Sequence, residues 1–357
     1  MSTVSLVSLC VLLPAIVAFA ETGKELAKEI SLGQKVAAQI EQQWERIADP
    51  RLEARVAMIL QRFMPSLQRD LPYEVRIIKE DVPNAFSLPG GIIYVTSGML
   101  DFVKSDAELA GVVAHELVHA EKRHVMIQVA RNQRLSLLAL GIAIAGGGEV
   151  AALVLGNVAQ VAIMNAYSRD LEREADLGAA TLLAERGYPP IAVVTTLERL
   201  EAEEWKRPYF DPGIYLDHPR VSERVMYLID FLRSKGWPIR RKEALHLLRI
   251  QVCAEGNEYV MTIDNFPVWK GPQNPEAKAL LDETASRLDR ALQLETQPYD
   301  IQVIQLEGVS HLKVGRDLVA SEEELLPGMP SLEDFRNSLV EALQRSRAQH
   351  PIANYLK

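Results

Sequence analysis

The segment that most constrains this chain is a predicted helix that carries two histidines and a glutamate among apolar residues. Residues 105–108 (Ser-Asp-Ala-Glu) have the spacing of a capping box, in which the serine bonds the first free N–H groups of a helix and the glutamate reaches back. The apolar periodic run that follows predicts a helix from 106 to about 124. Within it, residues 115–119 read His-Glu-Leu-Val-His. Because positions four apart stack on one helix face, both imidazoles can reach a single metal ion.

This pentapeptide has the residue types of a catalytic zinc site. His115 and His119 are the predicted zinc ligands, and Glu116 is the predicted general base that deprotonates the water held by the metal. The residues around them are apolar, so the helix is predicted to be largely buried, and buried imidazoles and carboxylates need partners, which a metal supplies. The alternative is a surface helix with two solvated histidines.

A catalytic zinc ion needs a third protein ligand and an open position for water. The predicted helix 168–186 offers Glu172 and Asp176, which are four positions apart and therefore face the same way. If Glu172 binds zinc, Asp176 can accept the other N–H of a ligating imidazole and fix its tautomer. Glu174 is expected to point elsewhere, as part of an exposed acidic helix face.

The remaining pattern predicts an α+β fold in two parts. Residues 21–240 are mainly helical, with a short sheet predicted from the runs 73–78 and 92–96, which are separated by the turn residues Leu-Pro-Gly-Gly. Residues 241–357 combine strand and helix patterns without a tetratricopeptide period, which predicts a separate small α+β domain of unknown role. The strands and helices expected there lie at 259–263, 276–293, 301–306, 312–314 and 332–345.

Two apolar stretches bear on membranes and export. Residues 1–20 are uncharged and end in Ala-Phe-Ala, which predicts a signal peptide cleaved after Ala20, with an uncleaved anchor as the alternative. Residues 135–164 are almost wholly apolar and are split by three glycines, and each half is too short to cross a bilayer core of about 30 Å. They are expected to be two buried helices, or else a hairpin that dips into a membrane or acts as a lid.

The net charge argues against nucleic acid as a partner, and the cysteine content argues against stabilisation by a disulfide bond. The formal net charge is −9, so there is no electrostatic footprint for nucleic acid. Cleavage of the signal peptide would leave Cys253 as the remaining cysteine, which cannot form an intramolecular disulfide. Stability must then come from the core and from the metal.

Three runs of residues, in order along the chain, resemble one protein family. They are residues 84–91 (Asn-Ala-Phe-Ser-Leu-Pro-Gly-Gly), residues 114–119 followed by Arg-His at 123–124, and residues 167–176 (Tyr-Ser-Arg before Glu-x-x-Ala-Asp). They are similar to motifs of the HtpX and CAAX-prenyl-protease family of gluzincin zinc metallopeptidases, and most similar to its soluble periplasmic branch, the BepA and LoiP type. The resemblance covers roughly residues 25–230. The transmembrane helices of HtpX before His115 and the tetratricopeptide domain of BepA have no counterpart here.

The resemblance implies a zincin-like catalytic domain with one Zn²⁺ per chain, Glu172 as third ligand and Asp176 as the partner of a ligand. It also implies a theme of membrane quality control. The His-Pro segment that starts at His218 resembles a family segment that returns to the cleft, where His218 would stabilise an oxyanion or occupy the open zinc position in a latent state. Arg224, in the same segment, would hold a nearby carboxylate or polarise a carbonyl.

A substrate strand is the other expected site. Gly91, Ile92, Ile93 and Tyr94 are predicted to form an edge strand beside the zinc helix, to which an extended substrate adds through main-chain hydrogen bonds. An ordinary core strand is the alternative. His124 lies five positions after His119 and is expected to turn off the metal-facing side, as a structural residue.

Together these features predict a secreted, periplasmic zinc metalloendopeptidase that cleaves misfolded or envelope proteins, with proteins or peptides as partners and membrane contact through 135–164 as an option. One rival is a membrane-associated quality-control protein with chaperone-like binding and low or latent proteolysis. A second rival is an integral-membrane protease. An intact Glu116 argues against the first rival, because a purely structural metal site has no use for that carboxylate.

Overall fold

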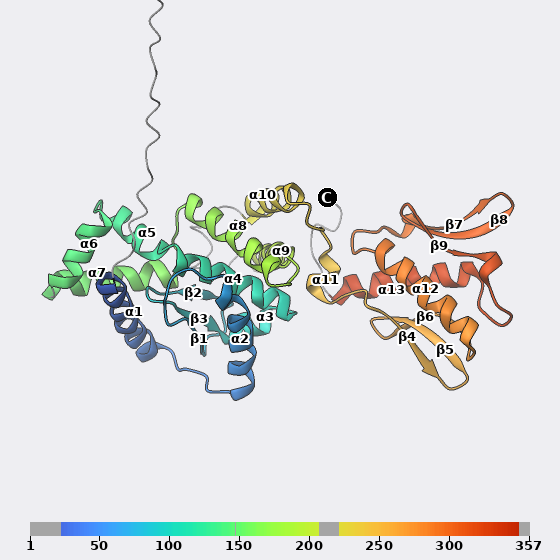
Figure 1. The fold of residues 1–357 in the computed structure, drawn as a ribbon, viewed down its shortest axis with the longest axis horizontal. Helices are drawn as coiled ribbons and strands as arrows, with labels where there is room; N and C mark the ends of the chain where they lie inside the picture. The colour runs from blue at the N-terminus through green and yellow to red at the C-terminus, as the bar shows by residue number, and fades with distance from the viewer. Residues whose placement is uncertain (1–22, 147, 207–220, 350–357) are drawn as a thin grey trace, which may run out of the picture.

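The computed structural model describes residues 23–146, 148–206 and 221–349. The predicted signal peptide and His218 lie outside these residues. Mostly helical, with small sheets, the described chain has the α+β character expected from the sequence (Figure 1). Its elements fall into two groups along the chain, one up to residue 245 and one from residue 250.

The first group places helices around one small sheet. Before the predicted zinc helix come α1 (Gly23–Gln43), α2 (Pro50–Phe63), η1 (Met64–Ser66), β1 (Glu74–Ile78), β2 (Ala85–Ser87), β3 (Ile92–Thr96) and α3 (Ser97–Phe102). From that helix onward come α4 (Asp106–Glu121), α5 (His124–Asn132), α6 (Leu137–Gly146), α7 (Gly148–Ile163), α8 (Arg169–Glu185), α9 (Ala192–Lys206), α10 (Val221–Ser234) and α11 (Arg241–Leu245).

The sheet has the order β1-β3-β2, so β3 is its central strand. β1 pairs with β3 in parallel, and the short β2 pairs with its other side in antiparallel fashion. All five residues of β3 are buried. The expectation that 91–94 forms an edge strand is therefore wrong, and the core-strand alternative holds. Because both edges of β3 are already hydrogen-bonded, an extended substrate cannot add there.

The predicted zinc helix, α4, lies at the centre of the first group and packs against the sheet, α8 and α9. At its N-terminus the serine half of the predicted capping box is confirmed, because Ser105 Oγ accepts a hydrogen bond from Glu108 N at 3.1 Å. The Glu108 carboxylate instead accepts from Lys104 N (2.9 Å) and pairs with Arg199 (3.0 Å). The helix ends at Glu121, not near 124, because the chain enters the left-handed region at residue 123 (φ 58°) before α5 begins.

The apolar stretch 135–164 forms the two helices α6 and α7, which pack on each other and on α5, while α7 also contacts α1. Leu140, Val154 and Val158 are buried on the inner face. Leu153 is 65% exposed, so the pair also carries apolar residues on its outer side. Across the described parts of the chain, every helix is too short or too polar to span a membrane.

The second group consists of two similar units in tandem. The first unit contains β4 (Ile250–Glu255), β5 (Glu258–Ile263), β6 (Phe266–Pro272) and α12 (Pro275–Ala291). The second contains η2 (Pro298–Asp300), β7 (Ile301–Leu306), β8 (Val309–Val314), β9 (Asp317–Ser321), η3 (Glu322–Glu324) and α13 (Leu332–Gln349). The strands and helices predicted here are confirmed, but the repetition and the strands β4, β6 and β9 were missed.

The two units match in detail. Each opens with Ile-Gln-Val, at 250–252 and at 301–303, and each forms an antiparallel three-stranded meander. Each middle strand carries a register shift just after a fully buried residue, Met261 in β5 and Leu312 in β8. The units also interlock, because α12 packs on β9 as well as on its own strands, and α13 packs on β6. They therefore share one core.

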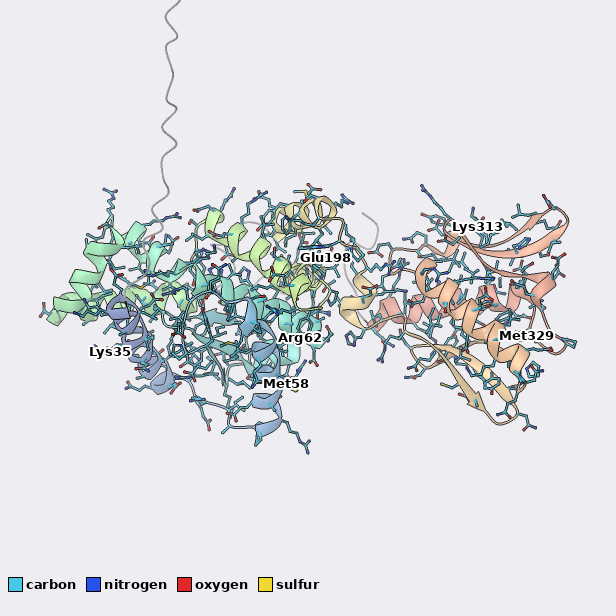
Figure 2. The ribbon with its side chains drawn as sticks, viewed as in Figure 1. Lys35, Met58, Arg62, Glu198, Lys313 and Met329 are labelled. Atoms are coloured by element: carbon cyan, nitrogen blue, oxygen red, sulfur yellow. The ribbon has the colours of Figure 1, made fainter. Side chains whose placement is uncertain are left out.

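Helix α11 joins the two groups. Ala244 belongs to the core of the first group and Leu245 to that of the second. Arg241 bonds Glu198 of α9 and Glu295 of the second group, each at 2.6 Å; Glu198 is labelled in Figure 2. The predicted boundary at 240/241 thus falls at the first residue of this connecting helix.

Candidate metal centre

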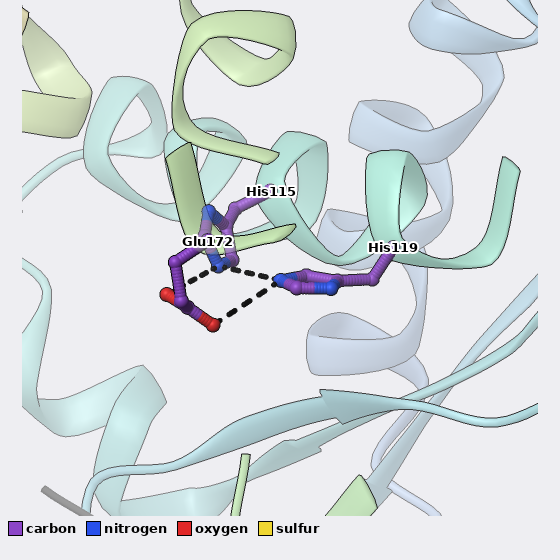
Figure 3. Close-up of side chains that lie close together, drawn as sticks. All are labelled: His115, His119 and Glu172. Carbon is purple, nitrogen blue, oxygen red and sulfur yellow. Dashed lines mark hydrogen bonds and ion pairs between the residues drawn. The ribbon is translucent and has the colours of Figure 1, made fainter. Parts of the chain in front are cut away.

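His115, His119 and Glu172 converge at one point, although Glu172 comes from a different helix (Figure 3). His115 and His119 stand one turn apart on α4, and Glu172 lies in the first turn of α8, which packs against α4. The two histidine Nε2 atoms are 3.1 Å apart. Glu172 Oε1 lies 3.6 Å from His119 Nε2, and Glu172 Oε2 lies 3.8 Å from His115 Nε2. The three side chains named from the sequence as ligands are thus brought together.

The outer nitrogen of His115 is held by Asp176. His115 Nδ1 lies 3.1 Å from Asp176 Oδ1, and the Asp176 side chain is fully buried. Asp176 also accepts hydrogen bonds from the hydroxyl of Tyr227 and from Arg224. Burial alone would raise the pKa of Asp176, but the charge of Arg224 and the bond from His115 hold that pKa well below its usual range. An ionised Asp176 fixes the proton of His115 on Nδ1, which turns the lone pair of Nε2 toward Glu172.

Arg224 contacts two carboxylates of α8. Its Nε and Nη2 donate to Asp176 at 2.8 and 2.7 Å, in the fork geometry that suits arginine. Its Nη1 is 3.1 Å from Glu172 Oε2. Of the two roles considered for Arg224, the structure matches the one in which it holds a carboxylate.

Glu116 follows His115 on α4 and is 3% exposed. Its Oε2 is buried and has no hydrogen-bond partner among the residues that the structure describes. Burial raises the pKa of Glu116 to about 7; His115 opposes this rise, and the charge of Glu172 adds to it. A carboxyl group in this condition exchanges a proton readily near neutral pH.

Sequence reasoning missed two contacts of the second histidine, His119. Tyr167 stacks on the His119 ring, with the ring centroids 4.1 Å apart. His124, expected to turn away, lies with its Nδ1 2.9 Å from His119 Nδ1. Glu174 is exposed and outside the cluster of three, as expected, and its Oε2 lies 3.4 Å from His124 Nε2. No periodicity rule could place His124, because the helix that carries the motif breaks between the two histidines.

A pocket of about 90 Å³ opens beside His115 and Glu116. Its walls come from α3, α4, α9 and α10 and are mostly apolar: Met99, Val112, Val193, Leu197, Leu200 and Val221. A water molecule needs roughly 10–15 Å³ of such space, so the pocket holds several waters or one sizeable side chain.

The donor set fits a zinc ion. At zinc–ligand bonds of about 2.0–2.2 Å, a tetrahedral ion spaces its ligand atoms by about 3.3–3.6 Å. The two histidine nitrogens are 3.1 Å apart, and each lies close to this spacing from one oxygen of Glu172, His119 at 3.6 Å from Oε1 and His115 at 3.8 Å from Oε2. One ligand atom from each of the three residues lies within 4.8 Å of the others. With the proton of His115 held on Nδ1, its Nε2 presents a lone pair to a carboxylate, an arrangement that repels unless a cation lies between them.

Comparison with known proteins agrees with this site. The model of Peptidase family M48 matches residues 50–230, about half of the chain, and includes both helices that carry the three converging side chains. The metalloprotease LoiP of Escherichia coli is 32% identical over 168 residues, which cover 46% of this chain and 64% of that protein. The mitochondrial metalloendopeptidase OMA1 of Arabidopsis thaliana is 35% identical over 130 residues, covering 36% and 26%.

The beta-barrel assembly-enhancing protease of Escherichia coli is 26% identical over 296 residues, which cover 77% of this chain and 58% of that protein. The matches to these three curated relatives span between 26% and 64% of the relatives' own length. The family match covers the sheet, α4 and α8, and the family resemblance noted in the sequence is confirmed. The chain belongs to peptidase family M48.

Proposed function

We propose that this protein is a zinc metalloendopeptidase with a zincin-like (gluzincin) catalytic region. The observation that carries the proposal is the convergence of two imidazoles and a carboxylate beside Glu116, whose own carboxylate is buried and next to a pocket. The relatives named as metalloproteases support the same reaction class. His115, His119 and Glu172 would hold the ion.

A bound zinc ion would polarise the scissile carbonyl and make water in the cleft more acidic. Glu116 then acts as general base: a carboxylate oxygen takes a proton from the attacking water and passes it to the nitrogen of the leaving amine. Its pKa near 7 suits both halves of this transfer. Asp176 keeps the proton of His115 on Nδ1, and Arg224 balances the charge of the two carboxylates that it contacts.

A purely structural metal site is less well supported. Such a site uses a closed set of four protein ligands, whereas the described residues bring three together. It also has no use for Glu116, whose burial beside the ligands raises its pKa and therefore costs free energy in the ionised form. The combination favours an open position for water and substrate.

The substrates proposed are proteins or peptides with an apolar side chain next to the scissile bond. Apolar walls surround the pocket beside Glu116, and a side chain of that kind gains free energy by leaving water. Unfolded or misassembled envelope proteins expose many such side chains. The periplasm is the proposed compartment, because residues 1–20 have the pattern of a signal peptide. One relative is named for beta-barrel assembly.

The test compares the purified wild type with Glu116→Gln for zinc content and for cleavage of casein. Zinc binding should remain at about one ion per chain in both proteins, because the substitution removes none of the proposed ligands. Cleavage should fall by about 10²–10⁴-fold in the variant, because the group that transfers the proton is lost. Glu185→Gln is the matched control, since it removes an exposed carboxylate from α8 that bonds Ser66 and lies outside the pocket beside Glu116. Equal cleavage by wild type and Glu116→Gln would contradict the proposal.

A further inference from the structure

The imidazole of His124 faces back toward His119, which the proposed function makes a metal ligand. Helix α4 ends at Glu121, and α5 begins at His124, directly after the left-handed residue Arg123 (φ 58°). This turn brings His124, the first residue of α5, into a fully buried position. Its Nδ1 then lies 2.9 Å from Nδ1 of His119.

Two ring nitrogens at that distance form a hydrogen bond only if one of them carries a proton and the other does not. Nε2 is the atom of His119 that faces His115 and Glu172, so a metal held by these residues binds His119 through Nε2. The ring proton of His119 must then be on Nδ1. His119 is therefore the donor in this bond, and His124 Nδ1 is the acceptor.

The opposite nitrogen of His124 agrees with this assignment. With Nδ1 accepting, a neutral His124 carries its proton on Nε2. That atom lies 3.4 Å from Oε2 of Glu174, outside hydrogen-bond geometry but close enough for the negative charge of the carboxylate to favour a proton on Nε2. Glu174 is half exposed and also lies 3.3 Å from Lys122, so it belongs to the surface end of this chain of contacts.

The two histidines on α4 are thus held in different ways. Asp176 fixes His115 through a buried carboxylate, whereas His119 is stacked on Tyr167 and bonded at its edge by another imidazole. An uncharged acceptor leaves His119 less basic than a carboxylate partner would.

We propose that His124 is a positioning residue for the metal centre: it accepts the Nδ1 proton of His119 and thereby keeps His119 Nε2 aimed at the metal. This inference rests on the proposed function, because it assumes that His119 binds the ion. It differs from ordinary core packing, which would need the volume of the His124 ring but not its acceptor nitrogen.

The test uses two substitutions of the same residue. His124→Leu keeps an apolar volume in the core but has no acceptor, whereas His124→Asn can place its amide oxygen close to the position of Nδ1. Zinc affinity is measured by competition with a chromophoric chelator, and the thermal midpoint of the metal-free protein reports on folding. His311→Leu, in β8 of the second group, is the matched control.

We expect His124→Leu to weaken zinc binding by about 10–100-fold, the usual effect of removing the partner of a ligating histidine. His124→Asn should recover most of that loss, and the control should bind as the wild type does. Unchanged affinity in a folded His124→Leu would overturn the inference. An equal loss in both His124 variants would also overturn it, because the acceptor would then not matter.

A second readout covers the case in which His124→Leu does not fold. Long-range ¹H–¹⁵N correlations of the zinc-loaded wild type should show His119 protonated on Nδ1 and His124 on Nε2, and a proton on Nδ1 of His124 would refute the assignment. Failure of the proposed function looks different: a wild type that takes up no zinc removes the metal site, and this inference with it. A wild type that binds zinc tightly, together with a His124→Leu that binds equally well, removes this inference alone.

Discussion

Arg224→Met would leave two buried carboxylates without the guanidinium that now contacts both. Arg224 Nη2 lies 2.7 Å from Asp176 Oδ1, and its Nη1 lies 3.1 Å from Glu172 Oε2; both carboxylates are fully buried and the Arg224 side chain is 10% exposed. Methionine keeps much of the aliphatic volume, so the change isolates the charge. Removing one partner of a buried ion pair costs about 3–5 kcal/mol, because the remaining charge is stranded in a poor solvent.

The loss should appear in the metal-free protein as faster amide hydrogen exchange in α8. At about 1.4 kcal/mol per factor of ten, 3–5 kcal/mol corresponds to roughly a 10²–10⁴-fold loss of protection. Zinc should reduce the deficit, because a bound cation would supply positive charge beside Glu172. The effect of zinc addition on stability should therefore be larger in Arg224→Met than in the wild type.

Arg169→Met is the matched control, since Arg169 is the first residue of α8 and its Nη1 lies 3.7 Å from Glu223 Oε2. That pair is exposed on both sides, so its loss should cost at most about 1 kcal/mol. If Arg224→Met lost no more protection than Arg169→Met, the view that Arg224 balances the buried carboxylates would be refuted.

Three further predictions concern metal, packing and the second group. Chelation by EDTA should abolish cleavage and lower the thermal midpoint, and stoichiometric zinc should restore both; activity that persists in EDTA would contradict a metal mechanism. Gly33→Ala should destabilise the protein by about 1–3 kcal/mol in thermal unfolding, because the added Cβ would lie 1.7 Å from Pro89 O. Gly156→Ala is its control: the added Cβ would meet no atom within 4 Å, so this change should be neutral or stabilising. Trp269→Ala removes a ring stacked on Phe335, with the ring centroids 4.5 Å apart, and should lower the free energy of unfolding of the second group by about 3–5 kcal/mol. Zinc content should stay at the wild-type level; a parallel loss of zinc would show that the two cores are not separate.

The helix that carries the metal motif could be predicted because local signals agreed along it. Ser105 caps the first turn, and the apolar run that follows fixes both its existence and its buried state. Helical spacing made Glu172 a candidate, and the family resemblance implied it as third ligand; the structure brings it next to the two histidines. Spacing could not predict the end of the helix, because the left-handed residue there is Arg123, and arginine carries no sequence signal for that conformation.

The pairing of strands within the sheet was less predictable than the position of each strand along the chain. β3 was located correctly from its β-branched residues, but its pairing partner β2 has three residues, Ala-Phe-Ser, which carry no strand signal of their own. Without β2, an edge position was the natural interpretation, and the substrate strand was placed wrongly at 91–94. Which strand lies in the centre is decided by contacts between segments, not by either segment alone.

The tandem repeat in the second group escaped notice for a similar reason. The units share Ile-Gln-Val at their start and buried residues at matching positions, such as Met261 and Leu312, but few identical residues elsewhere. The insertion of η3 in the second unit also changes the spacing between its last strand and its helix. Repetition of this kind is visible in the pairing register of the strands and is not evident from the amino-acid sequence.

The most direct test of the central claim is a crystal structure of the zinc-loaded protein with anomalous data collected on both sides of the zinc absorption edge. The account predicts one anomalous peak per chain, at about 2.0–2.2 Å from His115 Nε2, His119 Nε2 and a carboxylate oxygen of Glu172. A peak at another place, or none at this site in protein that contains zinc, would contradict it.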